Sequence, residues 1–224
     1  MEGIEGIFGG ERLIDLFIKG GPVMYPILFC SILSLAIIIE RLISLRRGRI
    51  IRPETLFRVQ DLIRIERIAD IIELCQKNSS PMSRIVLAAI KNINQPKAEI
   101  KEAVSEAGRQ EVRVLERHLA TLGTIVSIAP LLGLLGTVTG MIRAFYTIAL
   151  RGVGEPTALA SGISEALLTT AAGLTVAIPS QLFYNYFINK VDSLTLDMEQ
   201  NSLDILEVFW EKDREDVVLS QKKS

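Results

Sequence analysis

Three long hydrophobic stretches without a charged side chain stand out from the mixed pattern of the rest of the chain. They cover residues 21–39, 118–142 and 166–189, with the single histidine counted as neutral. A helix needs ~20 mostly apolar residues to cross the ~30 Å hydrocarbon core of a bilayer, and each stretch approaches or exceeds this length. The pattern therefore predicts three transmembrane helices, at residues 21–45, 119–149 and 161–190.

Apolar residues at helical spacing continue outside these spans and predict further helices. Residues 1–20 suit a short amphipathic helix that lies on the membrane surface. Within residues 46–118, Pro53 stands at a favourable first helical turn, and the helical pattern after it continues to the KNSSP segment. Pro96 then opens a helix that we expect to run unbroken into the second span. Residues 191–224 repeat the pattern, so the sequence predicts an all-α integral membrane protein with long helical extensions.

The distribution of charge orients these segments relative to the membrane. The net charge is −1, so no strong overall field favours a nucleic acid. A basic cluster, RLISLRRGRIIR, directly follows the first span, whereas the loop between the last two spans carries one arginine and one glutamate. Loops rich in lysine and arginine stay in the cytoplasm. We therefore expect residues 46–118 and 191–224 in the cytoplasm, and residues 1–20 and 150–160 on the outer side.

Small residues form a stripe along one face of each of the last two spans. Their spacing of three and four positions places them on one side of a helix. They are Gly133, Gly136 and Gly140 in the second span, and Thr169, Gly173 and Ala177 in the third. Small residues let transmembrane helices approach closely. The stripes therefore predict either helix packing alone or a pore wall that receives a partner helix.

Thr137 and Thr170 place hydroxyl groups near the middle of their spans, within ~5 Å of the membrane centre at about 1.5 Å per residue. A threonine in hydrocarbon usually bonds the carbonyl of its own helix four residues earlier. The alternative is a hydroxyl that faces a polar pathway or a partner helix. The sequence leaves both interpretations open.

Glu165 opens the third span on the same face as Thr169. A carboxylate near a helix N-terminus interacts favourably with the helix dipole, so capping is one interpretation. An ionisable group inside a span also indicates function, so a place in an ion pathway is the other. Arg143 lies near the outer end of the second span, where it either snorkels to the interface or pairs with Glu165.

Pro130 and Pro179 lie within the second and third spans. A proline inside a helix leaves one backbone carbonyl without its amide donor, and we expect a kink at each position. Such carbonyls need protein or water partners at membrane depth. An internal cavity and a purely structural kink are both consistent with this pair.

No aspartate, glutamate, lysine or arginine lies near the centre of any predicted span. A chain that moves protons unaided normally carries a titratable group there. Either the protein moves no charge, or another subunit supplies the carboxylate. One histidine and two distant cysteines form no catalytic or metal-binding pattern, and no Lys-Ser/Thr pair follows the glycines as in a nucleotide-binding loop. We therefore expect no enzyme, no cofactor and no metal.

Two runs of residues, AP-x-x-GL-x-GTV-x-GM at 129–141 and EAL-x-x-T-x-x-GL-x-x-AIP at 165–179, resemble the MotA/TolQ/ExbB proton-channel family. Three predicted spans indicate its ExbB/TolQ branch. The resemblance implies a homopentamer in the bacterial inner (cytoplasmic) membrane, with a periplasmic N-terminus and a cytoplasmic C-terminus. It also implies two copies of an ExbD/TolR-like single-span partner that carries a membrane aspartate, and a TonB/TolA-like protein as a further partner.

The same resemblance implies a motor subunit that uses the proton motive force to energise outer-membrane transport or envelope maintenance. Thr137 and Thr170 match the family's pore-facing threonines, and Glu165 matches its glutamate in the third span. No family role carries over to Arg143. A membrane scaffold that conducts no ions and a sodium-driven subunit remain the alternatives.

Overall fold

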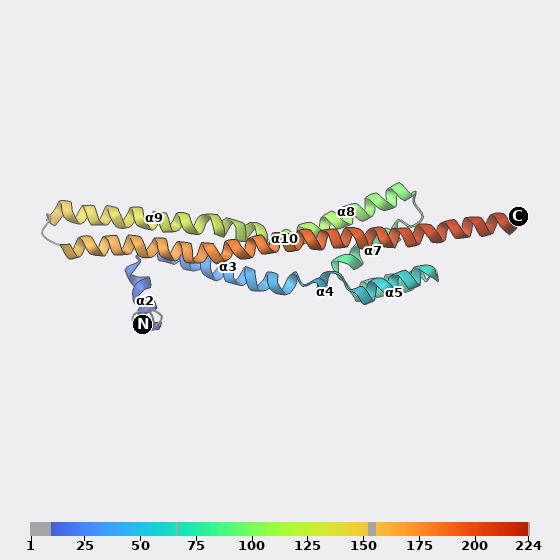
Figure 1. The fold of residues 1–224 in the computed structure, drawn as a ribbon, viewed down its shortest axis with the longest axis horizontal. Coiled ribbons are helices and arrows are strands. Elements are labelled where there is room, and N and C mark those ends of the chain that lie inside the picture. The colour runs from blue at the N-terminus through green and yellow to red at the C-terminus, as the bar shows by residue number, and fades with distance from the viewer. Residues whose placement is uncertain (1–9, 66, 152–155, 224) are drawn as a thin grey trace. The chain divides into compact units, whose positions relative to one another are not determined.

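The structure, a computed structural model, describes residues 10–65, 67–151 and 156–223 of the 224-residue chain (Figure 1). Every regular element in these ranges is an α-helix, which confirms the predicted all-α class. The helices are α2 (Gly10–Lys19), α3 (Met24–Ser44), α4 (Arg47–Ile50), α5 (Pro53–Arg64), α6 (Ile68–Lys77), α7 (Pro81–Lys91), α8 (Lys97–Glu116), α9 (Leu119–Arg151) and α10 (Pro156–Lys223). Parts of four predicted segments lie outside the described residues, namely residues 1–9 of the amphipathic helix, residue 66 of the segment 46–118, residues 152–155 of the outer loop and residue 224 of the last segment.

Three helical stretches of the described residues are long and apolar enough to cross a membrane. They lie at Met24–Ser44, Lys97–Leu150 and Leu159–Trp210. Large apolar side chains cover their outer surfaces, and Phe29, Leu131 and Leu167 are exposed by 67%, 62% and 65%. Apolar surface left in water costs about 25 cal/mol per Å², whereas lipid covers it without this cost. The predicted class of integral membrane protein is therefore confirmed.

The chain divides into two compact units, and the first comprises Met1–Glu40 and His118–Tyr186. In this unit α9 runs beside the first part of α10, and α3 lies along the same part of α10 (Figure 1). Small side chains contribute to the interior beside larger ones, because Ala129, Ala144 and Ala166 are at most 3% exposed, as are Leu119 and Leu122. Small residues allow the close approach on which helix packing in lipid depends. This unit holds every predicted site residue.

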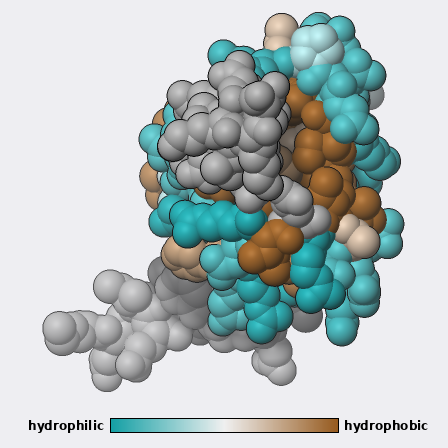
Figure 2. Space-filling view, turned by 90° about the vertical axis from the view of Figure 1, so that its right-hand side faces the viewer, coloured by the Kyte–Doolittle hydropathy of each residue, from teal (hydrophilic) through white to brown (hydrophobic). Residues whose placement is uncertain are grey.

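The second unit comprises Arg41–Arg117 and Phe187–Ser224. Its core includes Val59, Ile71, Met82, Val86, Leu194, Met198, Ile205 and Leu206, each at most 2% exposed. Its surface mixes hydrophilic and hydrophobic areas, as Figure 2 shows for one side of the molecule. This pattern is typical of amphipathic helices that bury one face.

Polar contacts fix individual helices of the second unit. Ser80 caps α7, because its hydroxyl accepts a 3.2 Å hydrogen bond from the backbone N–H of Ser83, and Pro81 occupies the first turn. Arg84 of α7 donates to both carboxylate oxygens of Glu111 in α8. The cap stabilises the start of α7, and the ion pair connects α7 to α8.

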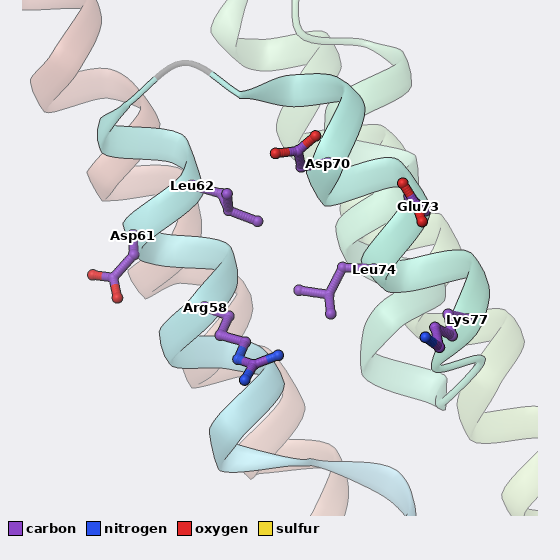
Figure 3. A pocket seen from close by; sticks show the side chains of 7 residues that line it. All are labelled: Arg58, Asp61, Leu62, Asp70, Glu73, Leu74 and Lys77. Carbon is purple, nitrogen blue, oxygen red and sulfur yellow. The ribbon is translucent and has the colours of Figure 1, made fainter.

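The helix expected from Pro53 to the KNSSP segment is wrong in one respect, because the structure divides it into α5 and α6. The two helices pack against each other, with Leu62 and Leu74 pointing into the space between them and charged side chains around it (Figure 3). The residues that surround this pocket include Arg58, Asp61, Asp70, Glu73 and Lys77. No glycine or proline marks the break, so the sequence pattern carries no signal for it.

The helix expected to run unbroken from Pro96 into the second span is also divided. α8 ends at Glu116 and α9 begins at Leu119, where the charged sequence gives way to the apolar one. The interruption is slight, because Arg117 keeps helical dihedrals of φ −46° and ψ −42°. α10, in contrast, continues to Lys223 without a break, and neither glycine nor proline occurs after Pro179.

Candidate functional site

The two stripes of small residues meet each other, and α9 packs directly on α10 through them. A Cβ atom added to Gly136 would lie 2.1 Å from Oγ1 of Thr169, and one added to Gly133 would lie 3.1 Å from the Cα of Thr170. A Cβ on Gly173 would lie 2.6 Å from the carbonyl oxygen of Ala129. These positions accept only glycine without a shift of the helices. The stripes therefore pack against each other within one chain.

The contact between the two stripes, the α9–α10 seam, continues toward Arg151, where α9 ends. A Cβ on Gly140 would lie 2.8 Å from the carbonyl oxygen of Gly162, and one on Gly162 would meet the Cβ of Ala144 at the same distance. Thr169 is fully buried and Ala177 is 5% exposed, so both side chains also lie inside the unit. The four glycines of the stripes thus contact the other helix within the chain, and Thr169 and Ala177 are buried. Their predicted role as a pore wall for a partner helix stays a prediction.

The three threonines of the site use their hydroxyls in different ways. Thr137 donates a 2.6 Å hydrogen bond to the carbonyl of Leu134 in its own helix. Thr169 donates within α10, to the carbonyls of Ala166 at 2.9 Å and Glu165 at 3.1 Å. Thr170 instead donates across the interface, to the carbonyl of Gly133 in α9 at 3.1 Å.

Thr137 lies at the edge of an apolar groove on the outer side of α9. Its other lining residues are Val138, Met141, Ile142, Phe145, Tyr146 and Ala149. Thr137 is half-buried, and its carbonyl partner Leu134 is 58% exposed. One hydroxyl therefore borders a surface that is otherwise apolar and open to lipid or to another helix.

Glu165 lies at the opposite end of the seam from Pro130 and pairs with Arg143. Nη1 of Arg143 donates to Oε1 of Glu165 at 2.6 Å, and the side chain of Glu165 is 15% exposed. We expected Arg143 either to snorkel to the membrane interface or to pair with Glu165, and the structure shows the ion pair. The carboxylate also touches Gly21, whose added Cβ would lie 2.0 Å from Oε1.

Pro130 and Pro179 lie inside α9 and α10, which both continue through them. Next to Pro179, the hydroxyl of Ser180 donates to the carbonyl of Val176 at 2.7 Å and lies 2.6 Å from the hydroxyl of Ser34 in α3. Ser180 has only one hydroxyl proton, so Ser34 is the donor of the second bond. Ser34 was not singled out from the sequence, although the two serines of the first apolar span, Ser31 and Ser34, are the signal that could have found it.

The described residues offer no obvious place for a metal ion. Among them, no group of three or more histidine, cysteine, aspartate or glutamate side chains could hold one. The side chains gathered around the seam are hydroxyls, backbone carbonyls and one paired carboxylate. Hydroxyls donate and accept hydrogen bonds, and carbonyls and carboxylates accept them. This set provides no nucleophile paired with a base.

The fold and the site together define a multi-pass α-helical membrane protein with a glycine-rich interface between two apolar helices. The model of the MotA/TolQ/ExbB proton channel family matches residues 77–200. The chain belongs to this family.

Three relatives illustrate the range of the family around this chain. The ExbB-like 1 protein of Synechocystis sp. is 37% identical over 80% of this chain and 71% of its own length. The biopolymer transport protein ExbB of Neisseria meningitidis is 27% identical over 85% of this chain and 93% of its own length. The Tol-Pal system protein TolQ of Haemophilus influenzae is 39% identical over 47% of this chain and 48% of its own length.

Proposed function

We propose that the chain is the pentameric channel subunit of a proton-driven motor in the bacterial inner membrane. Its partner is a single-span protein of the ExbD/TolR type, present in two copies, whose helix carries the membrane aspartate. The work is delivered, through a TonB/TolA-like protein, to an outer-membrane process such as transport or envelope maintenance. The names of the relatives, a biopolymer transport protein and a Tol-Pal system protein, support this class of client.

The observation that carries the proposal is the uncharged character of the α9–α10 pair around Thr137 and Thr170. Residues 119–142 and 166–189 contain no charged side chain, yet they present hydroxyls and a carbonyl near the membrane centre. Such groups can solvate a proton-carrying side chain but cannot carry the proton themselves. They supply half of a proton site, and the partner aspartate supplies the other half.

Each predicted residue has a part in this proposal. Thr137 and Thr170 line the ion pathway, and Glu165 lies at its periplasmic end. The packed glycines keep the wall thin and smooth, and Pro130 and Pro179 interrupt the backbone ladder near it. A charge that crosses 100 mV releases ~2.3 kcal/mol, so a wall without strong binding sites suits the rotation or sliding of a partner helix.

A membrane scaffold without ion conduction is the second candidate. One specific observation favours it: the glycines of α9 and α10 are occupied by contacts within the chain. Packing of α9 on α10 is enough to account for these glycines, without a partner helix. The two candidates differ in whether a single-span, aspartate-bearing protein belongs to the complex.

The distinguishing experiment is purification of the tagged chain from the membranes of its own host, followed by reconstitution into vesicles that contain a pH-sensitive dye. We expect a co-purifying single-span protein with an aspartate in its span. Proton uptake should require that protein and stop when its aspartate is changed to asparagine. A stable complex without such a partner, or uptake that survives this change, contradicts the proposal. Uptake of sodium ions down a sodium gradient, in place of proton uptake, would identify the sodium-driven alternative.

A further inference from the structure

The ion pair between Arg143 and Glu165 joins α9 and α10 beyond the charge-free part of the spans. The two partners differ in their surroundings: the side chain of Arg143 is 53% exposed, whereas that of Glu165 is 15% exposed. The carboxylate is therefore the enclosed member of the pair. An enclosed charge at membrane depth is costly unless a counter-charge lies beside it.

A third segment of the chain closes on the same carboxylate. Gly21, in the turn before α3, has a φ of +74°, a conformation that favours glycine. Its added Cβ would lie 2.0 Å from Oε1 and 2.8 Å from the carboxyl carbon of Glu165. Oε1 thus lies between the guanidinium of Arg143 and the backbone of the turn.

The backbone of Glu165 is held independently of its side chain. Its carbonyl accepts a hydrogen bond from Thr169 at 3.1 Å, and the neighbouring Ala166 packs against Gly140. Loss of Arg143 would therefore release the carboxylate group without moving the helix on which it stands. The orientation of the carboxylate depends on Arg143 and on the space that Gly21 leaves.

We propose that Arg143 is a positioning residue that clamps the Glu165 side chain against the Gly21 turn. Together they form a neutral connection between α9, α10 and the segment that leads into α3. The clamp itself requires neither a partner nor an ion current.

The test is the reactivity of Glu165 with dicyclohexylcarbodiimide, a hydrophobic reagent that modifies protonated carboxyl groups in membranes. Arg143→Gln removes both the counter-charge and the contact that holds the carboxylate, so it should raise modification of Glu165 about tenfold. Arg143→Lys keeps the charge and should stay at the wild-type level. Quantification of the peptide that contains Glu165 by mass spectrometry provides the measurement. Equal modification in the wild type and in Arg143→Gln overturns the proposal.

A second variant keeps the test decisive if Arg143→Gln fails to fold. Gly21→Ala should push the carboxylate away from Arg143 and also raise its modification. Gly20→Ala is the matched control, because its added Cβ meets only the flexible side chain of Met24 and a more distant carbonyl oxygen. Equal modification in the two glycine variants overturns the role of Gly21. Modification needs no partner protein, so this result is independent of the proton-uptake experiment.

Discussion

Oγ1 of Thr170 donates a 3.1 Å hydrogen bond to the carbonyl oxygen of Gly133, across the interface between α10 and α9. In an α-helix that carbonyl also accepts the backbone N–H four residues later, which here belongs to Thr137. The two threonines are therefore connected through one carbonyl group. A change at either position acts on the same turn of α9, where that helix contacts α10.

The close approach of α9 and α10 predicts a large effect of alanine at Gly173. The added Cβ would meet the carbonyl oxygen of Ala129 at 2.6 Å and the Cα of Gly133 at 3.1 Å, and neither backbone atom can move alone. We expect Gly173→Ala to lower the free energy of unfolding by about 1–3 kcal/mol, as other overpacked interiors do. Thermal unfolding of the purified protein in detergent provides the measurement.

Gly108→Ala in α8 is the control for this substitution. Nothing lies within 4 Å of its added Cβ, so alanine should raise stability by up to ~1 kcal/mol through helix propensity alone. If Gly173→Ala behaves like Gly108→Ala, the glycine seam does not hold the two helices together.

The buried hydrogen bond between Ser34 and Ser180 predicts a smaller effect. The two hydroxyls are 4% and 1% exposed and connect α3 to α10. Ser34→Ala removes this bond and leaves that of Ser180 to Val176 intact, so we expect a loss of about 0.6 kcal/mol, the average for such contacts in membranes. Ser127→Ala should cost less, because its exposed hydroxyl bonds only its own helix. Equal melting temperatures for the two variants would argue against the α3–α10 contact.

Much of this arrangement follows from the sequence. Spacing of three and four residues predicts which faces of α9 and α10 carry the glycines, and hydropathy predicts the membrane spans. The acceptor of Thr170 is not predictable in this way, because a hydroxyl can turn to its own helix or to a neighbour. The contact of Gly21 with Glu165 joins residues far apart in the chain, and periodicity describes only local structure. The break between α5 and α6 carries no glycine or proline signal at all.

Burial raises the pKa of the Cys75 thiol to about 11, and a hydrogen bond with Ser83 offsets only part of this effect. Below about pH 8.5, the ordinary thiol pKa, both folded and unfolded states are protonated and full stability is present. As the pH rises from there toward 11, only the unfolded state loses its proton, so stability falls.

This environment predicts slow alkylation of Cys75. In a Cys30→Ser variant, iodoacetamide at about pH 8.5 should leave the folded protein largely unmodified, because the thiolate is the nucleophile and is scarce. Modification should become complete once the protein is unfolded in dodecyl sulfate. Rapid modification of the folded protein, read by mass spectrometry, would contradict the burial of this thiol.

The ion pair of Arg84 and Glu111 predicts stability in the second unit. The hydrogen bonds between Arg84 and Glu111 raise the pKa of Arg84, and the Glu111 side chain is only 10% exposed. Glu111→Gln should cost about 1–2 kcal/mol, since Arg84 is partly solvated and retains other partners. Glu106→Gln, whose carboxylate pairs with Arg109 on the open surface, should change the unfolding temperature little. The reverse order of these two effects would contradict the fold of this unit.

The central claim is that the hydroxyl of Thr170 belongs to a proton pathway completed by a partner. Its most direct test is proton uptake by vesicles that contain the complex with its co-purified partner, compared among three variants. Thr170→Val should abolish uptake without changing assembly, whereas Thr170→Ser, which keeps the hydroxyl, should retain most of it. Thr139→Val removes a bond within α9 alone and should conduct normally. Wild-type uptake by Thr170→Val would contradict the account.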